Sequence, residues 1–114
     1  MLNDRAILID LETAARRIAE FVNGYDLERF RQDAKTWSAV LYQISVIGEA
    51  VKRLSQPFRD AHPTIPWAQI AGMRNRVIHG YDTVDLDLVW QTATVSVPDL
   101  QMAIAPLLAA VADD

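Results

Sequence analysis

The sequence predicts an all-α fold. Apolar residues recur every three or four positions along almost the whole 114-residue chain, which is the period of an amphipathic helix. No segment alternates strictly between apolar and polar residues, as a half-buried strand would. The chain has four glycines, five prolines and no cysteine, which excludes a disulfide framework and thiol chemistry. We therefore expect a single domain over residues 1–114, an up-and-down bundle of four main helices and one short helix.

The first predicted helix lies at the N-terminus and ends near Gly24. Its apolar stripe consists of Ile7, Leu11, Ala14, Ile18 and Phe21. Asp26 can cap a short second helix that runs to about Lys35, with Leu27 and Phe30 turned inward.

The third predicted helix begins at a cap on Thr36. Small residues at Gly48 and Ala50 lie beside its apolar stripe, so another helix can approach closely there. The stripe consists of Trp37, Val40, Ile44, Ile47, Val51 and Leu54.

A connector with three prolines separates the third and fourth helices and spans residues 57–66. Pro66 suits the first position of a helix, where its missing N–H is not needed. The fourth helix is predicted from Pro66 to about His79, with Gly80 just beyond its end.

The last predicted helix is capped by Asp82, Thr83 or Asp85. The ring of Pro98 would crowd the carbonyl of Thr94, which predicts a kink there. Because the apolar stripe keeps its phase through Pro98, one kinked helix is expected rather than two separate helices. The stripe consists of Leu86, Trp90, Ala93, Val97, Leu100, Ile104, Leu107 and Val111.

The third and last helices are apolar around much of their circumference. A bundle of this size needs less apolar surface than they offer, which leaves a generous core or a two-fold dimer interface as explanations. Closed two-fold pairs are the commonest assemblies of soluble proteins, so we expect a homodimer.

The net charge is −4. All eleven Lys and Arg residues lie in residues 1–79 beside nine acids, whereas residues 80–114 hold six Asp and no cation. Any anion site is therefore expected to be local and to lie in the first part of the chain.

No 18-residue window is both apolar and uncharged, and the N-terminus lacks the order of a signal peptide, which predicts a cytoplasmic protein that crosses no membrane.

One cluster of residues could carry chemistry, and it lies at the end of the fourth helix. On a regular helix Arg74 and His79 point about 140° apart, whereas Asn75 and His79 share a face, so Asn75 is the natural neighbour to orient the imidazole. Arg74 and His79 could converge if the helix unwinds before Gly80, or across a symmetry axis. A phosphate between them would be held by the guanidinium while His79 moves a proton. The competing explanation is that Arg and His simply complement a helix C-terminus.

Other features favour structural explanations. Asp82, Asp85 and Asp87 lack the spacing of a calcium loop and are better explained as capping residues at a helix start. The tryptophans lie on apolar stripes and are expected in the core. No residues with metal-ligand spacing were identified, and no cofactor is expected.

The motif resembles the signature of the HEPN superfamily, an Arg followed after four to six residues by a His. It is similar in particular to the HepT-like toxins of HepT/MntA toxin–antitoxin systems, which carry Arg-x4-His-x-Tyr; here these positions are Arg74, His79 and Tyr81, with Asn75 beside the Arg. Further similar segments are Val46–Ala50, Ile65–Trp67, Ile70, Gly72–Met73, Val84–Asp85 and Val89–Trp90.

The resemblance implies a HEPN-type bundle and a metal-independent endoribonuclease that acts as a homodimer, with both motifs at the dimer cleft. It implies that His79 is the general acid or base in the attack of a ribose 2′-OH on the adjacent phosphate. Arg74 would stabilise the developing charge, and Asn75 would orient its neighbours.

The resemblance also implies a partner, a minimal nucleotidyltransferase antitoxin similar to MntA. This partner would neutralise the toxin by transferring AMP to a motif tyrosine, which in this chain is Tyr81. An alternative function is a catalytically inactive helical binding partner or substrate-positioning subunit of such a transferase, because related bundles do both. The acidic net charge favours this alternative, whereas the intact motif favours the ribonuclease.

Overall fold

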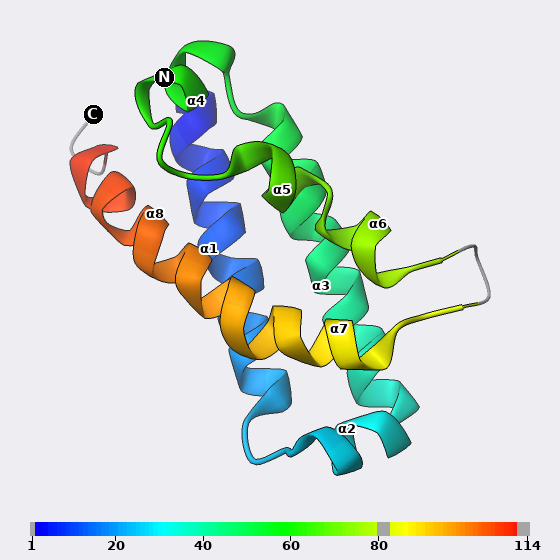
Figure 1. Cartoon of the computed structure of the whole chain (residues 1–114). Helices are drawn as coiled ribbons and strands as arrows, with labels where there is room; N and C mark the ends of the chain where they lie inside the picture. Colours follow the sequence, from blue (N-terminus) through cyan, green and yellow to red (C-terminus); the bar gives the residue numbers. More distant parts are fainter. Residues whose placement is uncertain (1, 80–82, 112–114) are drawn as a thin grey trace.

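The computed structural model describes residues 2–79 and 83–111, and within these ranges it contains helices and no strand. Three long helical segments run up and down beside one another (Figure 1). They are α1 (Leu2–Val22), α3 (Ala34–Arg53) and the continuous run of α7 (Leu86–Gln91), the π-helical turn η1 (Thr92–Ser96) and α8 (Val97–Val111). The predicted all-α class is confirmed.

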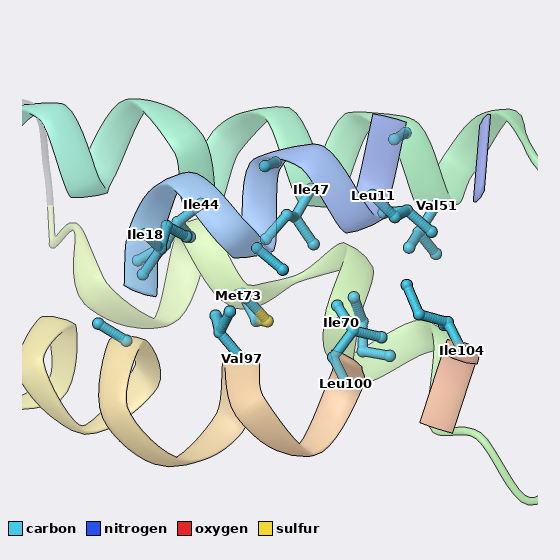
Figure 2. Close-up of a cluster of buried hydrophobic side chains, with 14 of the residues drawn as sticks. Leu11, Ile18, Ile44, Ile47, Val51, Ile70, Met73, Val97, Leu100 and Ile104 are labelled. Atoms are coloured by element: carbon cyan, nitrogen blue, oxygen red, sulfur yellow. The ribbon is translucent and has the colours of Figure 1, made fainter. Parts of the chain in front are cut away.

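The core lies between α1, α3 and α8, where the predicted apolar stripes meet (Figure 2). On α1, Leu11 and Ile18 are fully buried, and they face Ile44 and Ile47 of α3. The stripe of α8 closes the third side with Val97, Leu100 and Ile104. The helical period read from the sequence therefore identified the buried faces of all three long segments correctly.

The turn between α1 and α3 holds the short helix α2 (Leu27–Gln32). Gly24 has a φ of +80°, a conformation that glycine adopts without strain, and it ends α1 as expected. The carboxylate of Asp26 accepts a hydrogen bond from the backbone N–H of Arg29 at 2.9 Å, which confirms the predicted cap.

The predicted cap on α3 was wrong by one turn. Asp33, not Thr36, is the capping residue, because its side chain accepts a hydrogen bond from the Thr36 backbone N–H at 3.1 Å and the helix begins at Ala34. The hydroxyl of Tyr25 also donates to Asp33 at 2.6 Å, and these bonds hold the pKa of Asp33 below its usual value. Two acceptable caps three residues apart cannot be separated by local sequence alone.

We expected the proline-rich segment after α3 to be a connector without a helix. It instead contains the helix α4 (Gln56–Ala61). Ser55 caps this helix, and Pro57 falls in its first turn, where a proline removes no hydrogen bond. Asp4, which is 3% exposed, accepts hydrogen bonds from the Ser55 backbone N–H at 2.8 Å and from the Ser55 hydroxyl at 2.7 Å. This buried carboxylate joins the start of α1 to the start of α4.

The last long helix continues through Pro98, as predicted. Asp85 is its cap and accepts from the Leu88 backbone N–H at 3.1 Å. In η1 the backbone N–H of Val97 bonds to the carbonyl of Thr92, five residues earlier, which widens the helix just before the proline. Figure 1 shows the axis turning at this point.

Much of the outer face of this last helix is apolar and exposed in a single chain, although Asp87, Gln91 and Asp99 are exposed there too. By length and apolar composition, Leu86–Ala110 is the helix among the described residues that could cross a membrane, a property it shares with core helices of water-soluble proteins. Only 22% of its most apolar 18-residue stretch is buried, and Val95 and Met102 are 51% and 76% exposed. Much of its apolar surface therefore lies outside the core of one chain.

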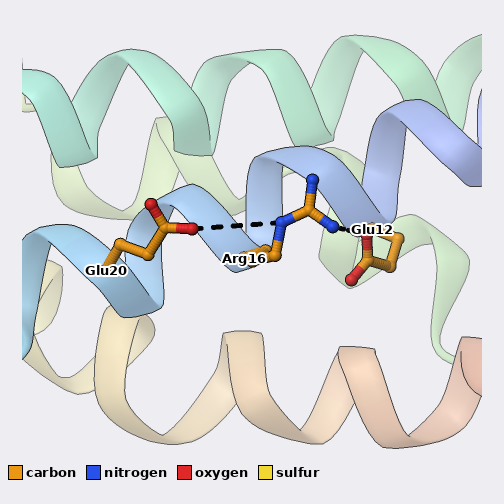
Figure 3. Close-up of polar contacts among 3 residues, drawn as sticks. All are labelled: Glu12, Arg16 and Glu20. Carbon is orange, nitrogen blue, oxygen red and sulfur yellow. Dashed lines mark hydrogen bonds and ion pairs between the residues drawn. The ribbon is translucent and has the colours of Figure 1, made fainter.

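The exposed face of α1 is charged and internally paired (Figure 3). Arg16 lies between Glu12 at 3.1 Å and Glu20 at 3.9 Å, both one helical turn away. Exposed pairs of this kind stabilise a helix by about 0.2–0.5 kcal/mol each. Arg16 is consequently engaged on its own helix.

Candidate functional site

The predicted fourth helix is divided into two short helices, α5 (Trp67–Ala71) and α6 (Met73–Val77). Gly72 separates them with φ −93° and ψ 4°, outside the helical range. Pro66 is the N-cap of α5 rather than its first residue. A mid-helix glycine weakens helix continuity, which is why an uninterrupted apolar period did not guarantee an uninterrupted helix here.

Gly48 on α3 allows the end of α5 to approach closely. A Cβ at Gly48 would lie 3.0 Å from the carbonyl oxygen of Ala71 and 3.7 Å from that of Ile70, so a methyl group would be in tight contact there and a branched side chain would push α5 away. Ile70 and Met73 are buried against the core beside this contact (Figure 2). The close approach expected at Gly48 is confirmed, and it places the following residue, Arg74, beside α3.

The chain leaves α6 before it reaches His79, so the prediction that the helix extends to His79 was wrong. Ile78 has extended backbone angles, φ −110° and ψ 119°, and an arm projects from the bundle there (Figure 1). The described part of this arm, residues 78–79 and 83–84, is held by an antiparallel bridge between Ile78 and Val84. The backbone N–H of His79 donates to the Thr83 carbonyl at 2.8 Å, and that of Asp85 donates to the Val77 carbonyl at 2.8 Å.

This arm changes the geometry expected at the motif. Unwinding before Gly80 was one of two ways in which Arg74 and His79 could converge, and the helix does unwind there. Because His79 has left the helix, Asn75 and His79 do not share a helical face, and the helical reason for Asn75 to orient the imidazole is lost. Tyr81, the predicted modification residue, lies outside the described residues.

Arg74 is exposed and lines an open pocket of about 240 Å³ between α6 and α3. The other lining residues are Ser38, Leu41, Tyr42, Ser45 and Ile78. Asn75 is exposed on α6, and its backbone N–H donates to the Gly72 carbonyl at 3.1 Å. His79 is exposed but does not line this pocket, so the described part of one chain gives Arg74 a pocket of mixed polar and apolar lining without bringing His79 into it.

Three pocket residues on α3 were not singled out by sequence reasoning. Ser38, Tyr42 and Ser45 lie on the side of α3 away from the buried stripe. The available signal was Tyr42, a large aromatic residue placed off the apolar stripe of its helix. Local sequence gave no means of knowing that this side of α3 would meet Arg74.

The acidic residues at the start of α7 have structural partners. Asp85 caps the helix, as predicted, and Asp87 is ion-paired with Arg31 of α2. Asp82 lies in the part of the chain that is not described. Within residues 2–79 and 83–111, no three His, Asp or Glu side chains cluster closely enough to hold a metal ion.

A family model described as "Ribonuclease HepT-like" matches residues 11–107. The chain is 38% identical over 94 residues to "Probable ribonuclease HepT" of Thermococcus cleftensis, which covers 82% of this chain and 86% of the relative. It is 36% identical to a candidate RNase of Caldanaerobacter subterraneus, covering 80% of this chain and 81% of that protein. A candidate RNase of Methanocaldococcus jannaschii is 35% identical, over 83% of this chain and 78% of the relative. No solved structure matches the chain.

Proposed function

The chain belongs to the HepT-like ribonuclease family, and we propose that it is a metal-independent endoribonuclease, the toxin of a toxin–antitoxin pair. The observation that carries this proposal is the position of Arg74. Arg74 is exposed and lines an open pocket that also holds serine hydroxyls, and an exposed His79 follows five residues later on a projecting arm. A guanidinium can bind the phosphate and an imidazole can transfer the proton in metal-free cleavage of a phosphodiester.

The proposed reaction uses the ribose 2′-hydroxyl that only RNA offers. His79 removes the proton from the 2′-oxygen as this oxygen attacks the adjacent phosphorus, or protonates the 5′-oxygen as its bond to phosphorus breaks, and solvent water accepts or supplies the other proton. Arg74 binds the non-bridging phosphate oxygens and stabilises the charge that develops on them. The products are a 2′,3′-cyclic phosphate and a free 5′-hydroxyl. Asn75, exposed beside Arg74, is proposed to position the bound phosphate.

We further propose that the working unit is a homodimer with the two motifs at one cleft. Two observations support a second copy. The outer face of α8 leaves Val95 and Met102 exposed, and within one chain His79 does not share the pocket of Arg74. A two-fold axis would place a second arm, with its own His79, near each Arg74.

The cleavage test uses purified protein, a defined single-stranded RNA and an excess of chelator. We expect cleavage at the same rate with and without the chelator, and fragments that end in a cyclic phosphate. An oligonucleotide with 2′-deoxyribose at the cleaved position is the matched control and is expected to stay intact, because it lacks the nucleophile. Absence of cleavage under all conditions would instead favour the non-catalytic binding subunit, which the acidic net charge of −4 also suits.

Tyr81 is the proposed site of regulation. We propose that a minimal nucleotidyltransferase antitoxin, encountered in the cytoplasm, transfers AMP to its phenol oxygen. The added phosphate would bring negative charge next to the motif and compete with RNA for Arg74. With a cognate transferase and ATP, the protein is expected to gain the mass of one or more AMP groups.

Tyr81→Phe is expected to abolish this mass gain, measured by intact-protein mass spectrometry. Tyr42→Phe is the matched control and should be modified normally. The hydroxyl of Tyr25 is already bonded to Asp33 at 2.6 Å and to Thr36 at 3.1 Å, which makes it a poor acceptor. Unchanged mass gain in Tyr81→Phe would move the modification to another residue.

A further inference from the structure

Tyr42 is a large aromatic side chain that the fold leaves in water. It lies near the middle of α3, and 67% of it is exposed. Its helix is otherwise well buried on the opposite side, through Val40, Ile44 and Ile47. No core contact therefore explains an aromatic residue here.

The surroundings of Tyr42 are those of a ligand site. Tyr42 and Arg74 line the same open pocket, so an aromatic ring and a guanidinium face one space of about 240 Å³. Ser38 and Ser45 add hydroxyl groups, and none of the lining residues that the structure describes carries a carboxylate. Leu41 and Ile78 are half-buried and form an apolar floor.

This combination matches the chemistry of a nucleotide. A guanidinium binds phosphate oxygens, and an exposed aromatic ring offers a face on which a base of any sequence can stack. The hydroxyls of Ser38 and Ser45, about one helical turn before and after Tyr42, can bond to base edges or ribose. The hydroxyl of Ser45 donates to the Leu41 carbonyl at 3.2 Å, which leaves its oxygen free as an acceptor.

We propose that Tyr42 is the stacking platform for a nucleobase of single-stranded RNA next to the phosphate held by Arg74. This inference rests on the proposed function and adds a base-binding subsite to it. The subsite lies on α3, outside the motif. It holds the strand while the 2′-hydroxyl and the phosphate meet His79, so its loss weakens binding rather than the chemical step.

The test measures the binding of a short single-stranded RNA to protein carrying His79→Ala, which prevents cleavage. In this background Tyr42→Ala is expected to raise the dissociation constant by about 5- to 150-fold, the range of base–aromatic stacking. Tyr42→Phe keeps the ring and should bind as tightly as the parent. Ile9→Ala removes another exposed apolar side chain, on α1, and should leave binding unchanged.

Cleavage and oligomeric state complete the test. In the otherwise wild-type chain, Tyr42→Ala is expected to raise KM with little change in kcat, and to keep the mass of the assembly in light scattering. Normal RNA binding by Tyr42→Ala would overturn the subsite while cleavage by the wild type leaves the proposed function intact. Dissociation of the assembly in Tyr42→Ala would also overturn the base-binding subsite, because it would mean that the Tyr42 ring of the wild type packs against a second copy of the chain. If wild type does not cleave RNA, the proposed function fails, and the binding comparison still decides the subsite.

Discussion

His79→Ala is expected to lower the rate constant of RNA cleavage by about 10²–10⁴-fold, the usual contribution of a positioned general acid or base. Arg74→Ala is expected to lower it by about 10²–10³-fold, because the charge that develops on the phosphate loses its partner. Both side chains are exposed, so neither change removes core packing. Single-turnover cleavage of a defined RNA, with circular dichroism as a check on folding, measures both effects.

The control for Arg74→Ala is Arg74→Lys, which keeps the charge but loses the planar two-pronged donor. We expect intermediate activity from it, because lysine binds phosphate as a point charge. Arg76→Ala is the control for general loss of positive charge. Arg76 is exposed on the same short helix but lines a different cavity, between α5–α6 and α8, and its loss should change cleavage little. Equal cleavage by wild type, Arg74→Ala and His79→Ala would remove this pair from the mechanism.

Mixing the two inactive variants shows whether the site crosses the dimer axis. If Arg74 of one protomer works with His79 of its partner, a dimer of Arg74→Ala and His79→Ala protomers contains one intact pair. Random exchange of protomers would then restore about a quarter of wild-type activity, since half the dimers are mixed and each has one of two sites. If both residues act within one protomer, no mixed dimer has an intact pair, and the mixture stays inactive.

The sequence predicted the long helices well because their burial follows a simple period. The stripes of α1, α3 and α8 are buried as expected, the cap at Asp26 was identified, and the observed cap Asp85 was one of three predicted candidates. Each of these features depends on neighbours within one or two helical turns. Local sequence contains that information.

The predictions that were wrong concern features that depend on contacts between distant parts of the chain. The arm that carries His79 is held by the bridge between Ile78 and Val84 and by the 2.8 Å bond from His79 to Thr83, none of which a helical period can indicate. The pocket around Arg74 likewise depends on residues of α3 that lie 29 to 36 positions earlier in the chain. Residue types at the motif were predictable from sequence, whereas the partners of these residues were not.

Gly48→Val is expected to damage both the fold and the site, because Gly48 is where α3 and α5 meet. Its Cβ would lie 3.0 Å from the Ala71 carbonyl oxygen, and the valine methyls would reach further into the same space. Overpacking of this kind lowers the free energy of unfolding by about 1–3 kcal/mol. The displaced Ala71 is three residues from Arg74, and a shift of about 1 Å at a catalytic group can lower the rate about 10²-fold.

The matched variants separate crowding from helix propensity. Gly48→Ala adds a single methyl group, and its gain of about 1 kcal/mol in helix propensity is expected to be offset by the close contact, leaving stability near that of the wild type. Glu49→Ala changes the next, exposed residue and should be silent in both assays apart from its ion pair with Lys52 at 3.3 Å. Denaturant unfolding and cleavage below the transition temperature provide the two readouts. If Gly48→Val matched the wild type in both, the contact between α3 and α5 would not be what positions Arg74.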